Sequence, residues 1–396
     1  MNWATVSLAS VCEKPQYGAI AKGTTRPVGP RFIRQTDIAS GRIDWSSVPF
    51  CDLPHGELVK FAVRRGDVLI SRLGNGVGNV AVVRDTKDAV FAGYLVRFRA
   101  RQSVADSEFI GYQLQSSAWK QHVSGFQSGA AQPTLNAQQM GEYCFKIPPL
   151  KEQRAIAATL SALDDKLESN RQVRQLTGEL LQTLFKSWFV TFERWGGNAP
   201  ANWREGRLGD VLFSVKNATK PGSEISRPYV PIDMMPTKSI GLEDFRPNDE
   251  AQSSLLLFEK NDILIGAMRI YFHRVSLAPF AGITRTTSFV LRPFDGTYLD
   301  FALLLCNEES TITYAEGTSK GSTMPYAVWE NGLAGLPTLI PPPDVARDFS
   351  QMVRPLVERI RDDLFETRTL IRIRDTLLPE LMTGRIRVPA AGEVVA

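Results

Sequence analysis

The side chains that most often carry catalysis or bind metals are few in this sequence and stand far apart. Its three histidines are His55, His122 and His273, so a histidine metal cluster or a Ser-His-Asp triad has little material. The run GTSKGS at residues 317–322 lacks the order Gly-x-x-x-x-Gly-Lys-Ser/Thr that cradles a nucleotide phosphate. We therefore expect neither metal-assisted nor nucleotide-driven chemistry.

Two proline pairs and one glycine-rich run also lack the residues that a methyltransferase signature or a nucleotide-binding loop would need. Pro148-Pro149 and Pro341-Pro342 each follow an isoleucine, whereas the signature of amino-group methylation places Asn or Asp before the prolines and an aromatic residue after them. The run GNGVG at 74–78 lies between strand-like runs, which favours a hairpin loop over a nucleotide cradle. The sequence predicts no active site.

Composition indicates a soluble protein of two domains. The chain has 396 residues, 43% of them apolar and 22% charged, and this length is large for one hydrophobic core. It has no apolar run long enough to span a bilayer, and it does not begin with a basic region and an apolar stretch. Cys12, Cys51, Cys144 and Cys306 form no Cys-x-x-Cys pair. We expect buried free thiols in a reducing cytosol.

Charge is distributed unevenly although the net value is only +4. Residues 1–150 hold 17 Lys and Arg against 11 Asp and Glu, and residues 194–343 hold 14 against 16. The first segment can carry a basic face. The second would have to gather its arginines on one side, and an ordinary solvated surface remains open for it.

The chain is a tandem repeat. The matching runs lie about 195 residues apart: IRQTDI at 33–38 with VPIDMM at 230–235, GDVLISR at 66–72 with NDILIG at 261–266, FAG at 91–93 and 280–282, and IPP at 147–149 and 340–342. One copy is therefore about half of the chain, which indicates a duplication and not a solenoid of short repeats.

Each copy has a β-rich segment with turn residues, which we call a head, followed by a proline pair and a long helical pattern. The apolar stripe of the first helix is expected at Ile156, Leu160, Leu163, Leu167, Val173, Leu176, Leu180 and Leu184. The stripe of the second is expected at Phe349, Val353, Leu356, Ile360, Leu364, Leu370, Leu377 and Leu381. Spacings of four and three residues are typical of a coiled-coil seam.

Asn170 interrupts the first stripe at a seam position, where a buried polar residue can fix the register. A single head cannot bury a stripe along a helix of roughly 50–60 Å. We therefore expect the two helices to pack together, antiparallel because each follows an equivalent head, with pseudo-twofold symmetry. The alternative is that each helix folds separately onto its own head.

Several runs make the chain resemble the specificity subunits of type I restriction–modification systems. The clearest is PPLKEQRAIA at 148–157, continued by Leu160, Leu163, Asp164 and Lys166, which looks like the start of the family's conserved helix. The resemblance spans the chain in the family's order: VSLASVCE at 6–13, WREGRLGD at 203–210 and LLPELMTG at 377–384. The second helix departs from it by beginning with PPDVAR at 342–347, so the two helix starts are not expected to make identical partner contacts.

The resemblance implies a DNA-binding subunit that reads a bipartite double-stranded site, one half with each domain. It implies two copies of an N6-adenine methyltransferase subunit and restriction/translocase subunits as partners. No cofactor is expected in this chain, because S-adenosylmethionine, ATP and magnesium would act on the partners. The expected location is the prokaryotic cytoplasm, at the nucleoid when bound to DNA, in a system that defends against phage.

Residues for DNA recognition are proposed from side-chain type, since Arg, Lys, Asn and Gln read base edges and hydroxyls contact phosphates. In the first head the candidates are Arg72, Asn75 and Asn79, together with Gln132 in a run, 128–136, that resembles a family loop. In the second head they are Arg269, Tyr271, His273, Arg274, Lys320, Ser322 and Tyr326. An ordinary surface or loop-packing role remains the alternative for each.

The predicted fold is α+β: two tandem target-recognition domains, β-rich with short helices, joined by two long helices in an antiparallel coiled coil. The expected segments are domain one, 1–147; helix one, 148–193; domain two, 194–342; helix two, 343–385; and a tail, 386–396. The favoured function is a non-catalytic specificity subunit. The rivals are the recognition region of a single-chain restriction enzyme and a coiled-coil scaffold that does not bind DNA.

Overall fold

The chain folds into two compact units. The computed structural model describes residues 3–126, 134–224, 226–242, 244–321 and 323–388. The first unit comprises Met1–Lys166 with Ile371–Ala396, and the second comprises Leu167–Leu370. Each unit therefore contains one head and a part of both long helices.

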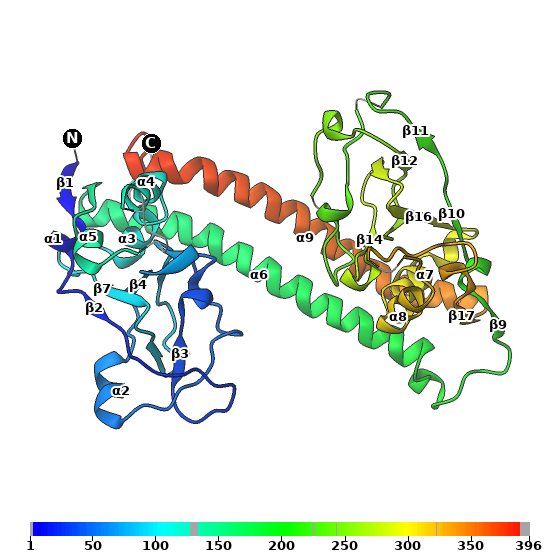
Figure 1. Ribbon diagram of the computed structural model, residues 1–396, viewed down its shortest axis with the longest axis horizontal. Coiled ribbons are helices and arrows are strands. Elements are labelled where there is room, and N and C mark those ends of the chain that lie inside the picture. Colours follow the sequence, from blue (N-terminus) through cyan, green and yellow to red (C-terminus); the bar gives the residue numbers. More distant parts are fainter. Residues whose placement is uncertain (1–2, 127–133, 225, 243, 322, 389–396) are drawn as a thin grey trace, which may run out of the picture. The chain divides into compact units, whose positions relative to one another are not determined.

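The first head is built on an antiparallel sheet of four strands in the order β2-β7-β4-β5: Gln16–Tyr17, Leu95–Arg99, Asp67–Ser71 and Val80–Val82. Two strand pairs flank it: β1 (Ala4–Ser7) with β8 (Cys144–Ile147), and β3 (Arg31–Ile33) with β6 (Ala89–Phe91). The short helices are α1 (Leu8–Val11), α2 (His55–Phe61), α3 (Ser107–Gln113), α4 (Ser117–Gly125) and α5 (Ala137–Gly141). α3 lies beside the long helix α6 (Leu150–Phe189), whereas α2 lies at the end of the unit away from it (Figure 1).

The second head repeats this plan. Its four-stranded antiparallel sheet has the order β10-β16-β13-β14: Leu212–Ser214, Ser288–Pro293, Ile263–Gly266 and Val275–Leu277. Beside it are the pair β9 (Arg204–Arg207) with β17 (Pro337–Ile340), and a sheet of β11 (Ala218–Thr219), β12 (Leu255–Phe258) and β15 (Gly282–Arg285). Its helices are α7 (Leu299–Cys306) and α8 (Glu309–Gly317).

The duplication extends to one buried ion pair. Asp67 at the start of β4 accepts a 2.6 Å hydrogen bond from Nε of Arg99 on β7, and Asp262 before β13 accepts one of 2.7 Å from Nε of Arg292 on β16. Each carboxylate also accepts a bond from the backbone N–H three residues earlier. A buried carboxylate needs such partners. We call this carboxylate with its arginine and backbone N–H the clamp, and in both heads it sets where the central strand begins.

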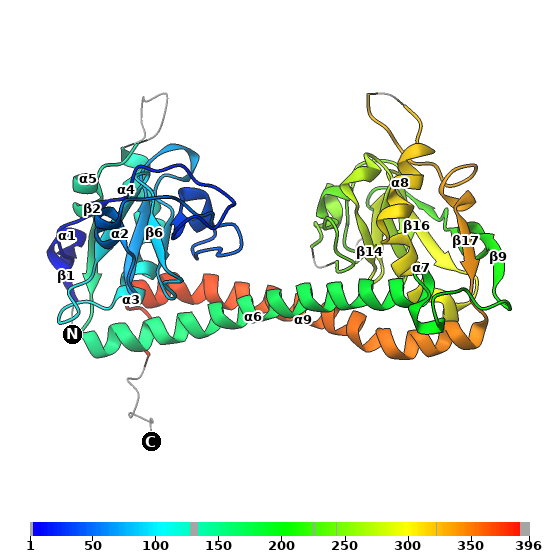
Figure 2. The same cartoon turned by 90° about the horizontal axis from the view of Figure 1, so that it is seen from below.

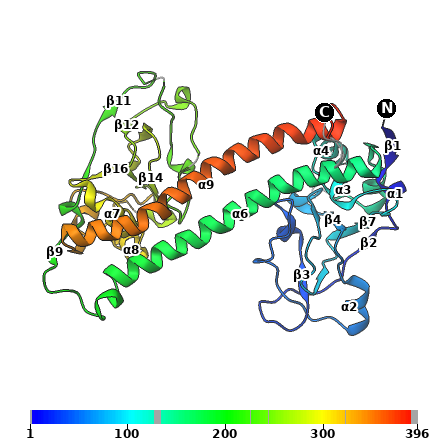
Figure 3. The same cartoon turned by 180° about the vertical axis from the view of Figure 1, so that it is seen from behind.

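The long helices α6 and α9 (Pro343–Thr383) pack antiparallel within each unit. In the first unit the end of α9 buries Leu381 and Met382 in the cluster that contains Ile156 and Leu160 of α6. Figures 2 and 3 show the ribbons of the two helices in other orientations. In the second unit the end of α6 meets the beginning of α9, where the rings of Trp188 and Phe349 are 5.4 Å apart. The α+β fold with paired helices is as expected.

A polar layer interrupts the apolar seam in the second unit. Asn170, 1% exposed, donates to Oε2 of Glu366 at 2.8 Å and lies 3.5 Å from Oγ1 of Thr367. Arg174 donates to the same Thr367 hydroxyl at 2.8 Å and to the carbonyl oxygen of Asp363 at 3.4 Å. Asn170 therefore occupies the buried position in the helix pair that its place in the stripe predicts.

These contacts obey a local twofold relation. Asn170 and Asp363 stand the same number of residues from the starts of α6 and α9, and so do Arg174 and Thr367. The Asn170–Thr367 contact and the Arg174–Asp363 contact are therefore equivalent under exchange of the two helices. The centre of this exchange lies at Gln172 of α6 and Phe365 of α9.

The expected seam is wrong at two positions of α6. Leu176 and Leu180 are 64% and 46% exposed, and the buried stripe instead runs through Leu181, Phe185 and Trp188. The aromatic residues pack into the core of the second unit, and this larger burial decides which face of α6 points inward. Of the other expected seam residues, Ile156, Leu160, Val353, Ile360 and Leu364 are buried and Leu163, Leu167, Leu184, Leu356 and Leu377 are half-buried.

Candidate nucleic-acid interface

In the first head, a glycine-rich loop follows β4 and lies beside a second loop. Leu73 forms an antiparallel bridge with Thr134, and the N–H of Leu135 donates to the carbonyl of Arg72 at 2.9 Å. The Arg72 guanidinium lies 5.1 Å from the centre of the Tyr17 ring. Asn75, at the loop tip, is exposed. The half-buried Arg72 therefore lies against an aromatic ring of β2, at the start of a loop whose tip carries an exposed amide.

Helix α4 supports this loop from behind. Trp119 donates from its indole N–H to the carbonyl of Gly78 at 2.8 Å. Gly78 has a φ of +84°, and a Cβ there would meet Val123 at 2.9 Å, so both the backbone and the space require glycine. Asn79 is half-buried behind the tip. The loop also forms one wall of an open cleft of about 710 Å³, which includes Lys120 on another wall.

The second head presents the same pair of loops. Met268 forms an antiparallel bridge with Tyr326, as Leu73 does with Thr134, and the N–H of Ala327 donates to the carbonyl of Ala267 at 2.8 Å. Arg269, Tyr271, Lys320 and Tyr326 are exposed. Four of the residues predicted to contact DNA therefore belong to two loops joined by one bridge.

The prediction for His273 is wrong because this side chain is buried, with 3% exposed. Its Nε2 lies 3.0 Å from the carbonyl oxygen of Asn307, and its Nδ1 lies 3.3 Å from Glu309. It holds the loop onto the neighbouring helices instead of facing solvent. Arg274 is half-buried and donates to the carbonyl of Ile232, so part of its donor capacity is already used.

Two predicted residues, Gln132 and Ser322, lie outside the described residues. The structure also brings forward aromatic residues that the sequence reasoning missed. Tyr17 and Tyr94 lie next to Arg72, which donates its N–H to the Tyr94 carbonyl, and both rings are exposed. In the second head Phe272 is exposed beside Tyr271. Phe272 could have been found in the sequence, because it directly follows the predicted Tyr271 in the run IYF at 270–272. Tyr17 could not, because it is far from Arg72 in the sequence.

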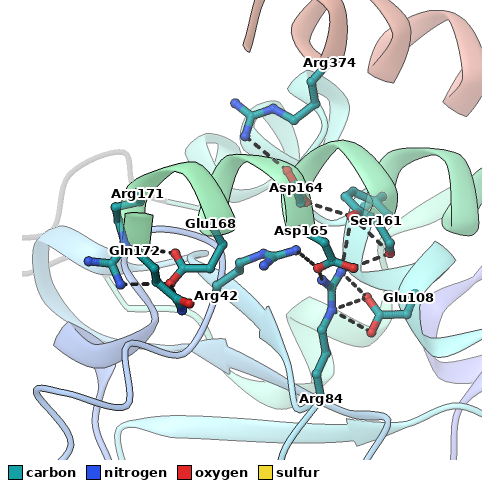
Figure 4. A network of polar contacts seen from close by, with 11 residues as sticks. Arg42, Arg84, Glu108, Ser161, Asp164, Asp165, Glu168, Arg171, Gln172 and Arg374 are labelled. Atoms are coloured by element: carbon teal, nitrogen blue, oxygen red, sulfur yellow. Dashed lines mark hydrogen bonds and ion pairs between the residues drawn. The ribbon is translucent and has the colours of Figure 1, made fainter. Parts of the chain in front are cut away.

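A charged network holds the first head against α6 (Figure 4). Arg84 donates from Nε and Nη2 to the carboxylate of Glu108 on α3 at 2.8 to 3.1 Å, and from Nη1 to Oδ1 of Asp165 on α6 at 3.0 Å. Arg42 donates to the same Asp165 oxygen at 2.6 Å. Bidentate arginine–carboxylate pairs constrain geometry as well as distance, so the network orients the head on its helix.

The same network reaches α9 within the first unit. The hydroxyl of Tyr112 donates to Oδ2 of Asp164 at 2.7 Å, and Arg374 of α9 lies 3.4 Å from the other oxygen of that carboxylate. Burial, with the adjacent Asp164 charge, raises the pKa of Tyr112 to about 12. The hydroxyl therefore remains a hydrogen-bond donor at neutral pH.

The described residues contain no group of three or more His, Cys, Asp or Glu that could hold a metal ion. Burial raises the pKa of Cys12 and Cys306 to about 12 and that of Cys51 to about 11, which leaves these thiols protonated and unreactive at neutral pH. Within the part of the chain that the structure describes, no helix is long and apolar enough to cross a membrane.

Comparisons with known proteins agree with this arrangement. Residues 1–176 match the type I restriction modification DNA specificity domain. The MjaIX type I restriction enzyme specificity subunit of Methanocaldococcus jannaschii is 24% identical over 310 residues, covering 71% of this chain and 69% of the relative. A putative MjaX specificity subunit of the same organism is 21% identical over 412 residues, covering 98% and 94%.

A crystal structure of a type I restriction–modification system S subunit from M. genitalium has the same fold, with a TM-score of 0.68, 18% identity and 96% of each chain covered. The duplicated heads and paired helices are therefore an arrangement that this chain shares with that S subunit. The family model over residues 1–176, the relatives and the S-subunit fold all indicate a type I restriction–modification DNA specificity subunit, and the names of the relatives support a DNA sequence-specificity role in such a system.

Proposed function

We propose that this chain reads a bipartite double-stranded DNA sequence, with one head on each half-site, and carries no catalytic activity of its own. The observation that supports this most strongly is the repeated loop pair. Both heads carry a loop after the central strand and a second loop beside it, joined by the bridges Leu73–Thr134 and Met268–Tyr326. Two equivalent surfaces with different side chains suit two half-sites of different sequence.

The side chains of these loops suit DNA. Arg72 and Asn75 in the first head can donate to base edges, and Arg269 and Lys320 in the second can contact phosphates or bases. Residues 263–294 contain four arginines and no Asp or Glu. Of these, the exposed Arg269 and Arg285 support DNA binding by a head whose overall composition is slightly acidic, whereas Arg292 is paired with Asp262 and Arg274 is half-buried.

Methylation, translocation and cleavage are then the work of partner subunits, which would bind S-adenosylmethionine, ATP and magnesium. The twofold relation of α6 and α9 about Gln172 and Phe365 supports two equivalent copies of a methyltransferase subunit, because symmetric helix faces offer the same contacts twice. The exposed Leu176 and Leu180 lie one turn apart on α6 and suit an apolar contact with a partner protein.

The experiment that tests two-headed reading exchanges one head at a time. Residues 1–147 are replaced by the matching head of a relative with a different target, and methylated motifs are mapped by sequencing in cells that also carry the methyltransferase. The reciprocal exchange of residues 194–342 is the matched control. Each exchange should change one half of the motif and leave the other unchanged. If both halves change together in either chimera, independent reading by the two heads is refuted.

Two assays on the purified chain separate the proposal from its rivals. With S-adenosylmethionine, ATP and magnesium it should neither methylate nor cut DNA. An activity abolished by a substitution in this chain would favour a single-chain restriction enzyme. Its affinity for DNA should fall as salt increases, because phosphate contacts release counterions. Absence of DNA binding at low salt would favour a pure assembly scaffold.

A further inference from the structure

The loop after β13 carries two exposed aromatic rings on a backbone that is held by contacts on both sides. Tyr271 and Phe272 belong to one turn of 3-10 helix, Ile270–Phe272, whose first residue is buried. Their side chains are 44% and 41% exposed and their ring centres are 5.0 Å apart. Single exposed apolar residues are common on protein surfaces, whereas two adjacent exposed rings form a small apolar patch that can bind a ligand. The tip is therefore an apolar projection on an otherwise polar loop.

The backbone on both sides of this tip is unusual. Arg269 and His273 have φ values of 51° and 52°, a left-handed conformation that residues other than glycine rarely adopt. Contacts hold both in place: the N–H of Arg269 donates to the carbonyl of Pro325 at 2.8 Å, and the buried His273 ring is held by Asn307 and Glu309. Such conformations persist where the surroundings enforce them, and they gather at functional sites.

The surroundings of the tip match a polyanion that contains flat apolar rings. Arg269 and Lys320 are exposed near it, and the Arg274 guanidinium lies 5.5 Å from the centre of the Phe272 ring. The segments 263–294 and 317–329, which include strands β13 to β16 as well as the two loops, together hold five basic and no acidic residues, and one of the five, Arg292, is paired with Asp262. Duplex DNA is the ligand that offers phosphates to the cations and stacked bases to the rings.

The first head differs at this place although its loop has the same length. Residues 73–80 read LGNGVGNV, whereas residues 268–275 read MRIYFHRV. The duplication therefore kept the loop and its bridge to the second loop and changed the tip from glycines to aromatics. The different tips indicate a difference in how the two heads engage DNA.

We propose that Tyr271 and Phe272 form a wedge that enters the duplex at one base step of the second half-site and unstacks it, while Arg269 and Lys320 hold the flanking phosphates. This rests on the proposed DNA-reading function of the second head. Pyrimidine–purine steps unstack most easily, so the second half-site contains such a step where the wedge enters. The first head, with its glycine tip, leaves its half-site stacked.

The test uses the full chain with its methyltransferase and short duplexes that carry the methylated motif. 2-Aminopurine, whose fluorescence rises when it is unstacked, replaces one base at a time in each half-site. Positions at and next to the methylated adenines are left unlabelled, because a methyltransferase flips its target base out of the stack. Among the remaining positions, the parent should brighten a probe in the second half-site and none in the first. The double variant Tyr271→Ala/Phe272→Ala should abolish that rise and weaken binding roughly 5- to 150-fold, the loss typical of one stacked base. A duplex with a mismatch at the same step should bind the parent more tightly than the paired duplex does, and the double variant equally well in both forms.

Phe294→Ala is the matched control, because this ring is 67% exposed in the same unit and packs on Phe213; its removal should change neither signal. Tyr271→Phe should keep the fluorescence rise. The wedge is overturned if the parent binds the motif with no fluorescence change, or if the double variant weakens paired and mismatched duplexes by the same factor. It is also overturned if the variant binds DNA normally but no longer copurifies with the methyltransferase. Failure of the parent to bind the motif at all overturns the proposed function and the wedge together.

Discussion

Both long helices continue from one unit into the other, so their common length should set the number of unread base pairs between the half-sites. We predict the result of adding four residues to each helix at the centre of their twofold relation, by duplicating residues 169–172 in α6 and 362–365 in α9. Four residues add about 6 Å at 1.5 Å per residue. B-DNA advances ~34 Å per turn of ~10 base pairs, so the unread gap should grow by about two base pairs.

The paired change is needed because α6 and α9 pack against each other in each unit. The insertions leave the Asn170–Glu366 contact on one side and the Arg174–Asp363 contact on the other, and they separate only Arg174 from Thr367. Four residues turn a helix by roughly 400°, about 40° past a full turn, so the apolar stripes stay nearly in phase.

Sequencing of methylated motifs measures the gap directly. The paired variant should give both parental half-site sequences with the longer gap. Two controls separate length from damage: the α6 insertion alone puts the helices out of step, and a paired two-residue insertion turns each stripe by roughly 200°. Both controls should lower thermal stability or abolish methylation. A stable paired variant that methylates with an unchanged gap would refute the idea that helix length measures the site.

Three further outcomes can be measured on the purified chain. Asn170→Leu should raise the melting temperature while blurring the helix register, because a buried polar residue at a seam position favours specificity over stability; a lower melting temperature would contradict this. Asp67→Ala should cost about 3–5 kcal/mol of unfolding free energy, because Asp67 also lies 3.4 Å from the guanidinium of Arg97 on β7, which is 5% exposed and would lose its neutralising carboxylate. Asp262→Ala should cost less, because its partner arginine is 40% exposed and can turn to water; equal losses would refute this reasoning. A thiol reagent at mildly alkaline pH should modify Cys144, the one exposed cysteine, in the folded chain and all four cysteines after unfolding.

The sequence predicted the repeat, the two long helices and the burial of Asn170, since each depends on a pattern that recurs within the chain. It could not decide between Leu180 and Leu181, which are adjacent and offer two possible faces to the partner helix. That choice is made by Phe185 and Trp188, which pack into a core assembled from distant parts of the second unit. Periodicity alone contains no information on that core.

The sequence was enough to predict which loops form the candidate site, but not which of their side chains are exposed. Loop composition located Arg72 and Tyr271, because polar and aromatic residues after a strand are visible in the sequence. His273 was misjudged because its burial depends on Asn307 and Glu309, which follow more than thirty residues later. Tyr17 was missed for the same reason, since only the fold brings β2 next to Arg72. Contacts between distant segments are the part that loop chemistry does not reveal.

The two heads show how one framework can hold different reading surfaces. The clamped carboxylates Asp67 and Asp262 precede the bridge residues Leu73 and Met268 by the same number of residues. The clamp therefore fixes where the central strand starts, and the strand fixes where the following loop begins. The bridge then fixes the position of the second loop beside it. Between the bridge and the next strand, glycines in one head have become arginines and aromatics in the other without a change of length. Substitutions there leave the buried frame intact, so the tips that we propose to read DNA can change while the geometry that presents them is retained.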